Sequence, residues 1–186
     1  AILASYTLIS LGYEYINKNV KTLSKKQSYY GAFSTAAFDT VTKAAGIFGA
    51  TNGQFLDLFP PDQSLETLKT IIYQKTVTLF EISFVCGWIF GGGDLDRLKE
   101  VEKLACHMGM AFQIADDIKD LENDVDLGNT SFAKIVGEKT AYEKCFEELR
   151  AFDEKLEELN ISTPNLLYLS KMLRDSLKKS PIQQKR

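Results

Sequence analysis

Long segments of this chain carry apolar residues at i, i+3 and i+4 spacing, which is the repeat of a helix with one buried face. Only four prolines occur in 186 residues, so few positions interrupt these segments. A half-buried strand would alternate apolar and polar residues, and no such alternation stands out. The spacing therefore predicts an all-α fold, organised as a helical bundle. Six helices are expected, at about residues 1–20, 32–58, 64–90, 94–123, 138–160 and from 164 into a lysine-rich tail.

Several residues mark where these helices begin and end. Pro60 and Pro61 stop the second helix, because the residue before a proline is driven out of the helical region. Ser64 and Asp94 are suited to cap the third and fourth helices, and Gly91–Gly93 separates them. Pro164 belongs in the first turn of the last helix, where its missing N–H costs nothing.

The composition excludes several classes of protein. Apolar residues make up 45% of the chain and charged residues 25%, as in ordinary globular domains and unlike disordered chains. The net charge of −3 gives no general attraction to nucleic acid, so no nucleic-acid partner is expected. Cys86, Cys106 and Cys145 form no C-x-x-C pair, which favours buried thiols in a reducing, cytoplasmic compartment. His107 is the only histidine, so a metal site with two histidines is excluded.

The start of the chain differs from that of a leader sequence. Residues 1–4 already resemble the middle of an apolar helix, and no basic segment or cleavage site accompanies them. The longest apolar stretch, residues 79–93, contains Glu81 and ends in three glycines, so it is too short to span a bilayer. We expect a piece of a longer protein, with membrane association through an absent N-terminal segment left open.

Three carboxylates lie together in the otherwise apolar segment from Phe112 to Asp120. On a helix, Gln113, Asp116, Asp117 and Asp120 fall within an arc of about 100°. A solvated helix face usually mixes charges of both signs, whereas this arc gathers like charges that repel. A hard cation such as Mg²⁺, held by one or two carboxylates and substrate phosphates, would remove the repulsion. A metal site and an ordinary solvated face both stay open on spacing alone.

Two further features are weak alone. Lys75 and Thr76 stand side by side in an apolar helix, where an ammonium and a hydroxyl can bind a phosphate, although most such lysines only reach the surface. Residues 53–58, Gly-Gln-Phe-Leu-Asp-Leu, place an amide and a carboxylate at i and i+3. Gly109 and Cys106 lie one and two turns before the acidic arc, where small residues either border a cleft or let two helices approach closely.

The ordered set of these motifs resembles the trans-isoprenyl diphosphate synthase (polyprenyl synthetase) family, of the geranylgeranyl and farnesyl diphosphate synthase type. The likeness runs from the first residue to about Gly137 and includes Leu79-Phe80, the glycines at 91–93 and the Gly-Met-Ala before Phe112. It implies an all-α bundle around a central cleft, usually a homodimer. It also implies a Mg²⁺-dependent enzyme that joins isopentenyl diphosphate to an allylic diphosphate, giving a longer linear prenyl diphosphate and pyrophosphate.

The resemblance also assigns roles to residues. Asp116, Asp117 and Asp120 correspond to the second aspartate-rich motif, which holds Mg²⁺ against the allylic diphosphate. Lys75 and Thr76 correspond to the pair that contacts this diphosphate, so Lys75 and Asp116 are the candidate catalytic residues. Ionisation leaves a carbocation and a multiply charged anion, which explains why metal ions and a lysine are needed. Released pyrophosphate is the expected base for the final proton loss.

Three further residues receive binding roles by the same resemblance. Gln113 corresponds to the amide beside the diphosphate, and Gln54 and Asp57 line the cleft in a supporting role. Two positions depart from the family pattern, with Asn129 where a lysine is expected and Ala133 where a proline is expected. One diphosphate contact is therefore missing, and Lys134 or Lys119 is the available substitute.

The family's first aspartate-rich motif and its neighbouring arginines have no counterpart here. Residues 1–186 are therefore expected to be the C-terminal part of one trans-prenyltransferase domain, inactive alone, with about 100 residues absent upstream or present as a separate chain. Three alternatives remain. One is a class I terpene cyclase, disfavoured by the repeated aspartates; another is a catalytically silent subunit, kept open by Asn129; the third is a helical scaffold without a ligand.

Overall fold

The computed structural model describes residues 2–24, 30–122 and 131–178. The elements within these ranges are helices joined by short connections, with no strand among them, so the all-α prediction is confirmed. The elements, in chain order, are α1 (Ile2–Ser24), α2 (Tyr30–Ala45), α3 (Ala50–Leu58), α4 (Leu65–Ile72), a π-helical turn η1 (Tyr73–Val77), α5 (Thr78–Phe90), a 3₁₀ turn η2 (Leu95–Arg97), α6 (Leu98–Glu122), α7 (Phe132–Val136), α8 (Glu138–Glu158) and α9 (Pro164–Lys178).

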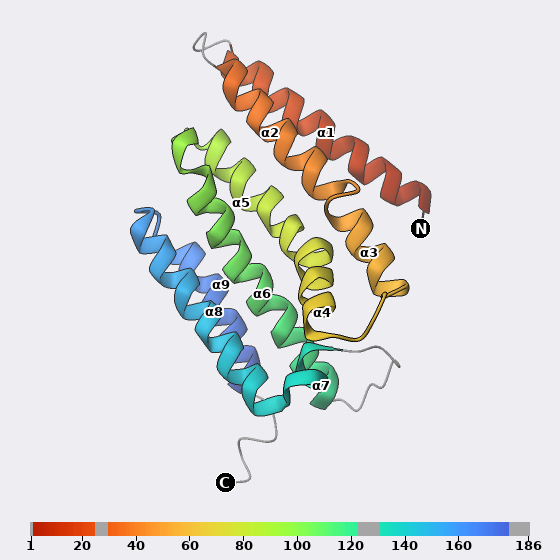
Figure 1. The fold of residues 1–186 in the computed structure, drawn as a ribbon. Coiled ribbons are helices and arrows are strands. Elements are labelled where there is room, and N and C mark those ends of the chain that lie inside the picture. Colours follow the sequence, from red (N-terminus) through yellow and green to blue (C-terminus); the bar gives the residue numbers. More distant parts are fainter. Residues whose placement is uncertain (1, 25–29, 123–130, 179–186) are drawn as a thin grey trace.

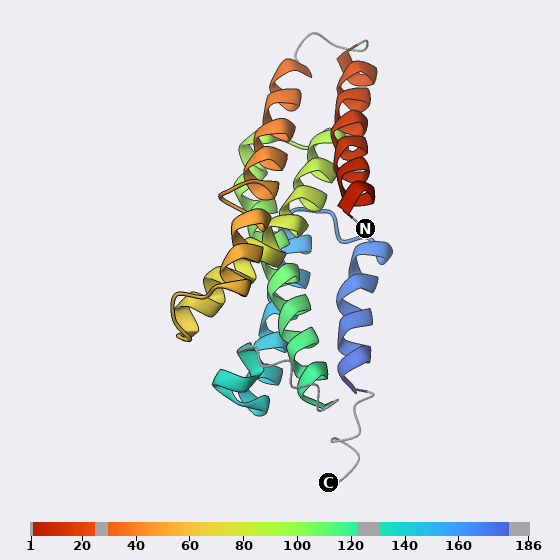
Figure 2. The ribbon, with the colours of Figure 1, turned by 90° about the vertical axis from the view of Figure 1, so that its right-hand side faces the viewer.

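Helix α6 is the centre of the bundle. It packs between α5 and α8, α2 covers the other side of α5, and α1 packs on α2 (Figure 1). When the molecule is turned by 90°, α1 and α9 lie on the same side of this layer (Figure 2). Two groups of buried apolar side chains hold α6 in place, and fully burying a residue such as Ile114 or Leu104 stabilises the fold by about 2 kcal/mol.

The predicted helix signals function as expected. The Ser64 hydroxyl accepts a hydrogen bond from the backbone N–H of Thr67 at 3.1 Å, and the Asp94 carboxylate accepts one from Asp96 at 2.9 Å. Pro164 is the first residue of α9. The caps at Ser64 and Asp94 satisfy N–H groups that a helix start leaves without a partner in the helix, and Pro164 has no N–H group to satisfy.

The predicted second helix is interrupted at residues 46–49, between α2 and α3. Gly49 allows the break, because a Cβ atom there would lie 2.0 Å from the carbonyl oxygen of Ala44. The predicted third helix is continuous from α4 to α5, but it widens into the π turn η1. Spacing did not reveal this turn, since it adds a single residue to an apolar segment. Helix α7 was not predicted, and the predicted end of α6 at Asn123 lies outside the described ranges.

Cys86, Cys106 and Cys145 are free thiols, and only Cys145 is fully buried. Burial raises the pKa of Cys145 to about 12 and that of Cys106 to about 11, so both are protonated at neutral pH. None of the helices in the described parts has the length and apolar character needed to cross a bilayer.

Candidate functional site

The π turn carries the predicted lysine and threonine, and α3 packs directly against its backbone. A Cβ atom on Gly53 would lie 2.2 Å from the backbone nitrogen of Lys75 and 2.6 Å from its Cα atom. The Asn52 Nδ2 atom donates a hydrogen bond to Gln74 Oε1 at 2.8 Å beside this contact. Glycine is therefore required at position 53, because only a residue without a side chain permits this close contact. The motif that contains Gly53 did not reveal this requirement.

Lys75 is paired with the carboxylate that the sequence also singled out. The distance from Lys75 Nζ to Asp57 Oδ2 is 2.6 Å, and the two side chains are 38% and 26% exposed. An ammonium has three N–H donors, so two remain for other acceptors when one is given to Asp57. Gln54 lies on the same helix, α3, and is exposed to solvent.

A chain of hydrogen bonds joins three elements of the structure, and we call it the relay. Thr76 Oγ1 donates to Gln113 Oε1 at 2.8 Å, which links the π turn to α6. Gln113 Nε2 donates to Asp117 Oδ1 at 2.9 Å, and the backbone N–H of Phe132, the first residue of α7, donates to Asp117 Oδ2 at 2.7 Å. Thr76, Gln113, Asp117 and the Phe132 amide therefore form one connected unit.

The three aspartates of α6 differ in their surroundings. Asp117 is 7% exposed, whereas Asp116 and Asp120 are exposed. Burial raises the pKa of Asp117 from its ordinary value, and the neighbouring Asp116 and Asp120 carboxylates raise it further. Hydrogen bonds from Gln113 and from the Phe132 amide oppose this rise, because they stabilise the ionised form.

The carboxylates present suit a hard cation. Within the described ranges, no three histidine, cysteine or acidic side chains form a ready metal cluster. Mg²⁺ characteristically binds through one or two carboxylates and takes its other ligands from water and phosphate oxygens. Asp116 and Asp120 supply that incomplete set, one helical turn apart on the exposed face of α6. The residues therefore fit Mg²⁺ together with a phosphate-bearing substrate.

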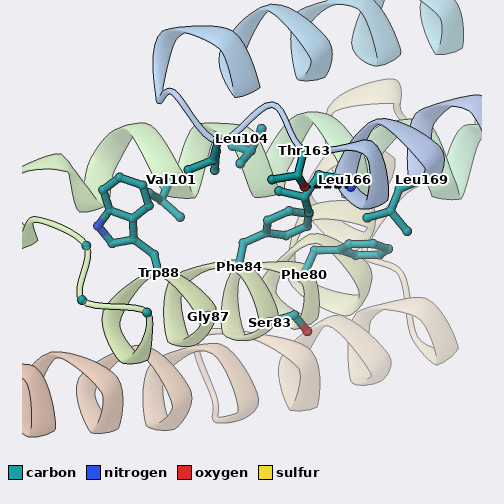
Figure 3. Close-up of a pocket in the computed structure, with 14 residues that line it drawn as sticks. Phe80, Ser83, Phe84, Gly87, Trp88, Val101, Leu104, Thr163, Leu166 and Leu169 are labelled. Carbon is teal, nitrogen blue, oxygen red and sulfur yellow. Dashed lines mark hydrogen bonds between the residues drawn. The ribbon is translucent and has the colours of Figure 1, made fainter. Parts of the chain in front are cut away.

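An apolar cavity of about 680 Å³ lies between α5, α6 and the start of α9. Phe80 and Phe84 extend from α5 toward Leu166 and Leu169 of α9, and Trp88 lies farther along α5 (Figure 3). The ring of Phe80 also contacts that of Phe112, with centroids 5.5 Å apart. The cavity thus begins at Phe80 of α5, which lies one helical turn after Thr76 of the π turn.

Small residues before the acidic arc were expected either to border a cleft or to let two helices approach closely. Gly109 lets α6 approach the π turn closely. A Cβ atom on Gly109 would lie 2.9 Å from the Cα atom of Val77. The α6 backbone therefore passes directly against the π turn, which brings Gln113 within reach of Thr76.

The comparisons with known proteins give a consistent result. Residues 1–146 match the family described as Polyprenyl synthetase. The chain belongs to this family. A large subunit of a heterodimeric geranylgeranyl pyrophosphate synthase from Arabidopsis thaliana is 32% identical over 164 residues, which cover 84% of this chain and 43% of the relative. A trans-prenyltransferase of African swine fever virus is 37% identical over 90 residues, 48% of this chain and 27% of the viral protein.

Solved structures share the polyprenyl synthetase fold of this chain. An FPP/GFPP synthase from Zymomonas mobilis aligns with a TM-score of 0.73 and 23% identity over 94% of this chain and 60% of its own. A geranyltransferase from Helicobacter pylori, complexed with magnesium and isoprenyl diphosphate, aligns with a TM-score of 0.63 and 24% identity, covering 80% and 53%. The chain spans less than half the length of the curated relatives that it matches.

Hydrogen bonds in the structure link most of the predicted residues of this polyprenyl synthetase. Lys75 joins Asp57, and Thr76 joins Gln113 and Asp117, so five of the eight predicted residues are linked directly. Asp116, Asp120 and Gln54 are exposed beside them on α6 and α3. The Phe132 amide was missed, and Ser131, which caps α7, was its one local signal. Asn129 lies outside the described residues.

Proposed function

We propose that the protein is a Mg²⁺-dependent trans-prenyltransferase. It joins isopentenyl diphosphate to an allylic diphosphate and releases pyrophosphate and a longer linear product, such as geranylgeranyl diphosphate. The observation that carries the proposal is the hydrogen bond from Thr76 to Gln113. This bond holds the Lys75-Thr76 pair of the π turn beside the helix that presents Asp116 and Asp120, so a cation and metal-binding carboxylates serve one diphosphate.

The residues of the chain divide the work of ionising the allylic substrate. Lys75 contributes a positive charge and free N–H donors that stabilise charge developing on the leaving diphosphate. The hydrogen bond between Thr76 and Gln113 holds the π turn against α6. Asp57 holds Lys75 in place until a diphosphate offers the lysine new acceptors. Apolar side chains that line the cavity, such as Phe80 and Phe84, exclude water, which would otherwise capture a carbocation.

Mg²⁺, bound by Asp116 and Asp120, would neutralise the diphosphate and make it a better leaving group. The set of ligands is limited to oxygen, which is the preference of this ion. Asp117 was also expected to bind the metal, but both of its carboxylate oxygens accept hydrogen bonds from the protein.

Replacing Lys75 by glutamine is expected to raise the Kd for an allylic diphosphate about 10-fold or more, because hydrogen bonds of charged groups contribute about 1.5–3 kcal/mol. Calorimetric titration with geranyl diphosphate and Mg²⁺ measures the change. Lys69→Gln is the matched control, since Lys69 is an exposed lysine of α4. An unchanged Kd for Lys75→Gln would contradict the role given to Lys75.

Product analysis tests the proposed reaction. The full-length protein is incubated with labelled isopentenyl diphosphate, geranyl or farnesyl diphosphate and Mg²⁺, and the prenyl product is extracted. A linear, longer product supports the proposal and gives its chain length. A cyclic product would instead indicate a terpene cyclase.

A catalytically silent subunit is the second candidate. Asn129 in place of the expected lysine favours it, because one expected contact with the diphosphate is then missing. Mg²⁺-dependent binding of diphosphate without turnover would identify this role. Turnover by the protein without a partner would exclude it.

A homodimer is part of the same proposal. Leu8, Leu11 and Tyr15 share one face of α1 and are 69%, 39% and 61% exposed. Exposed apolar side chains that line up on one helix favour contact with another protein surface. Light scattering of the full-length protein distinguishes a dimer from a monomer.

A further inference from the structure

Asp117 faces a different environment from the two aspartates beside it. Asp116 and Asp120 are one turn apart on an exposed face of α6, while Asp117 is turned about 100° away from Asp116 and is 7% exposed. A cation that arrives with its phosphate from solvent therefore meets Asp116 and Asp120 first.

Both oxygens of Asp117 already receive hydrogen bonds from well-placed donors. Gln113 Nε2 lies 2.9 Å from Oδ1, and the Phe132 backbone nitrogen lies 2.7 Å from Oδ2. Phe132 is itself 4% exposed, so its amide has little access to water as a replacement partner. Withdrawing the carboxylate toward a metal would leave a buried N–H group without an acceptor, which is costly.

The hydrogen bonds of Asp117 determine how the neighbouring amide is oriented. Gln113 Nε2 donates to Asp117 Oδ1, so the NH₂ group of Gln113 points toward Asp117. The carbonyl oxygen of Gln113 then faces Thr76 and accepts its hydroxyl proton. Asp117 thereby fixes the direction of the Thr76 hydrogen bond although the two side chains share only Gln113 as a partner.

We propose that Asp117 is a positioning residue that orients Gln113 and Thr76 and anchors α7, leaving the metal to Asp116 and Asp120. The assignment of the metal to Asp116 and Asp120 rests on the proposed function. The orientation of Gln113 and Thr76 by Asp117 does not, so the metal assignment and the orienting role can fail separately.

A double-mutant cycle in metal-free protein tests the orienting role. Asp117→Asn, Thr76→Val and their combination are unfolded in the presence of EDTA, with Asp120→Asn and Thr76→Val as the matched control cycle. If the relay is correct, the unfolding equilibrium constant of the double variant differs by about threefold or more from the value obtained by multiplying the effects of Asp117→Asn and Thr76→Val. The control pair is expected to multiply within about twofold. Multiplicative behaviour of both cycles would overturn the proposal, because an isolated anchor or a metal ligand would not couple to Thr76.

Hydrogen exchange of the Phe132 amide tests the division of labour without any substitution. The full-length wild-type protein is compared with and without Mg²⁺ and inorganic pyrophosphate, and calorimetry on the same samples verifies binding. Protection of this amide is expected to stay within about threefold or to rise. A tenfold or larger loss would show Asp117 leaving Phe132 for the metal and would refute its positioning role. If pyrophosphate does not bind at all, the proposed function fails, and the mutant cycle alone decides the role of Asp117.

Discussion

Replacing Asp116 by alanine is expected to lower kcat/KM for prenyl transfer by about 100-fold or more. The side chain is exposed at the site where metal and diphosphate would meet, and removing a group that stabilises developing charge commonly costs this much. Stability should be unchanged or slightly higher, because the substitution removes repulsion between Asp116 and the nearby Asp117 and Asp120 carboxylates. Steady-state rates at several Mg²⁺ concentrations, together with thermal unfolding, measure both effects.

The control for this experiment is Glu157→Ala. Glu157 is an exposed carboxylate of α8, so its removal makes the same change in charge away from the site. Its kcat/KM is expected to stay within about twofold of wild type. Activity of Asp116→Ala within threefold of wild type would mean that Asp116 does not take part in the reaction.

Substituting Gly53 by alanine should destabilise the protein by about 3 kcal/mol. The added methyl group would lie 2.2 Å from the Lys75 nitrogen and 2.6 Å from the carbonyl carbon of Gln74, both of which belong to a helix backbone. Backbone atoms cannot rotate away, so α3 and the π turn must separate, and overpacking costs about 1–3 kcal/mol or occasionally more. Urea denaturation followed by circular dichroism gives the loss in unfolding free energy.

Gly12→Ala is the matched substitution for Gly53→Ala. Nothing lies within 4 Å of a Cβ atom built on Gly12, which is an exposed position within α1. Alanine there is expected to stabilise by about 0.5–1 kcal/mol, since glycine is a poor helix former. Equal stability of the two variants would show that α3 does not press on the π turn as described.

Sequence reasoning succeeded where the signals are local. The caps at Ser64 and Asp94 and the position of Pro164 depend on residues within one turn, so each was predicted correctly. The break at Gly49 was missed, because the apolar spacing continues across it and the contact with the Ala44 carbonyl exists only after folding.

The site shows the same limit over longer distances. Lys75, Thr76 and Gln113 were singled out, but the bond between Thr76 and Gln113 joins residues 37 positions apart. Spacing placed Asp117 with its neighbours on one arc, and the structure separates it from them by burial. The cause is α7, a five-residue helix whose first amide binds Asp117 and whose existence the residue pattern did not predict.

The π turn has a consequence for insertions and deletions. Deleting one residue from Tyr73–Val77 would restore regular α-helical geometry and leave the direction of the following helix nearly unchanged, because a π turn accommodates one extra residue within a helix. Val85 and Ile89, which are completely buried, would therefore stay in the core. The deletion would instead remove the widened backbone that packs against Gly53 and carries Lys75 and Thr76. Homologues that keep this site should therefore keep the extra residue, whereas its loss should cost the site and not the fold.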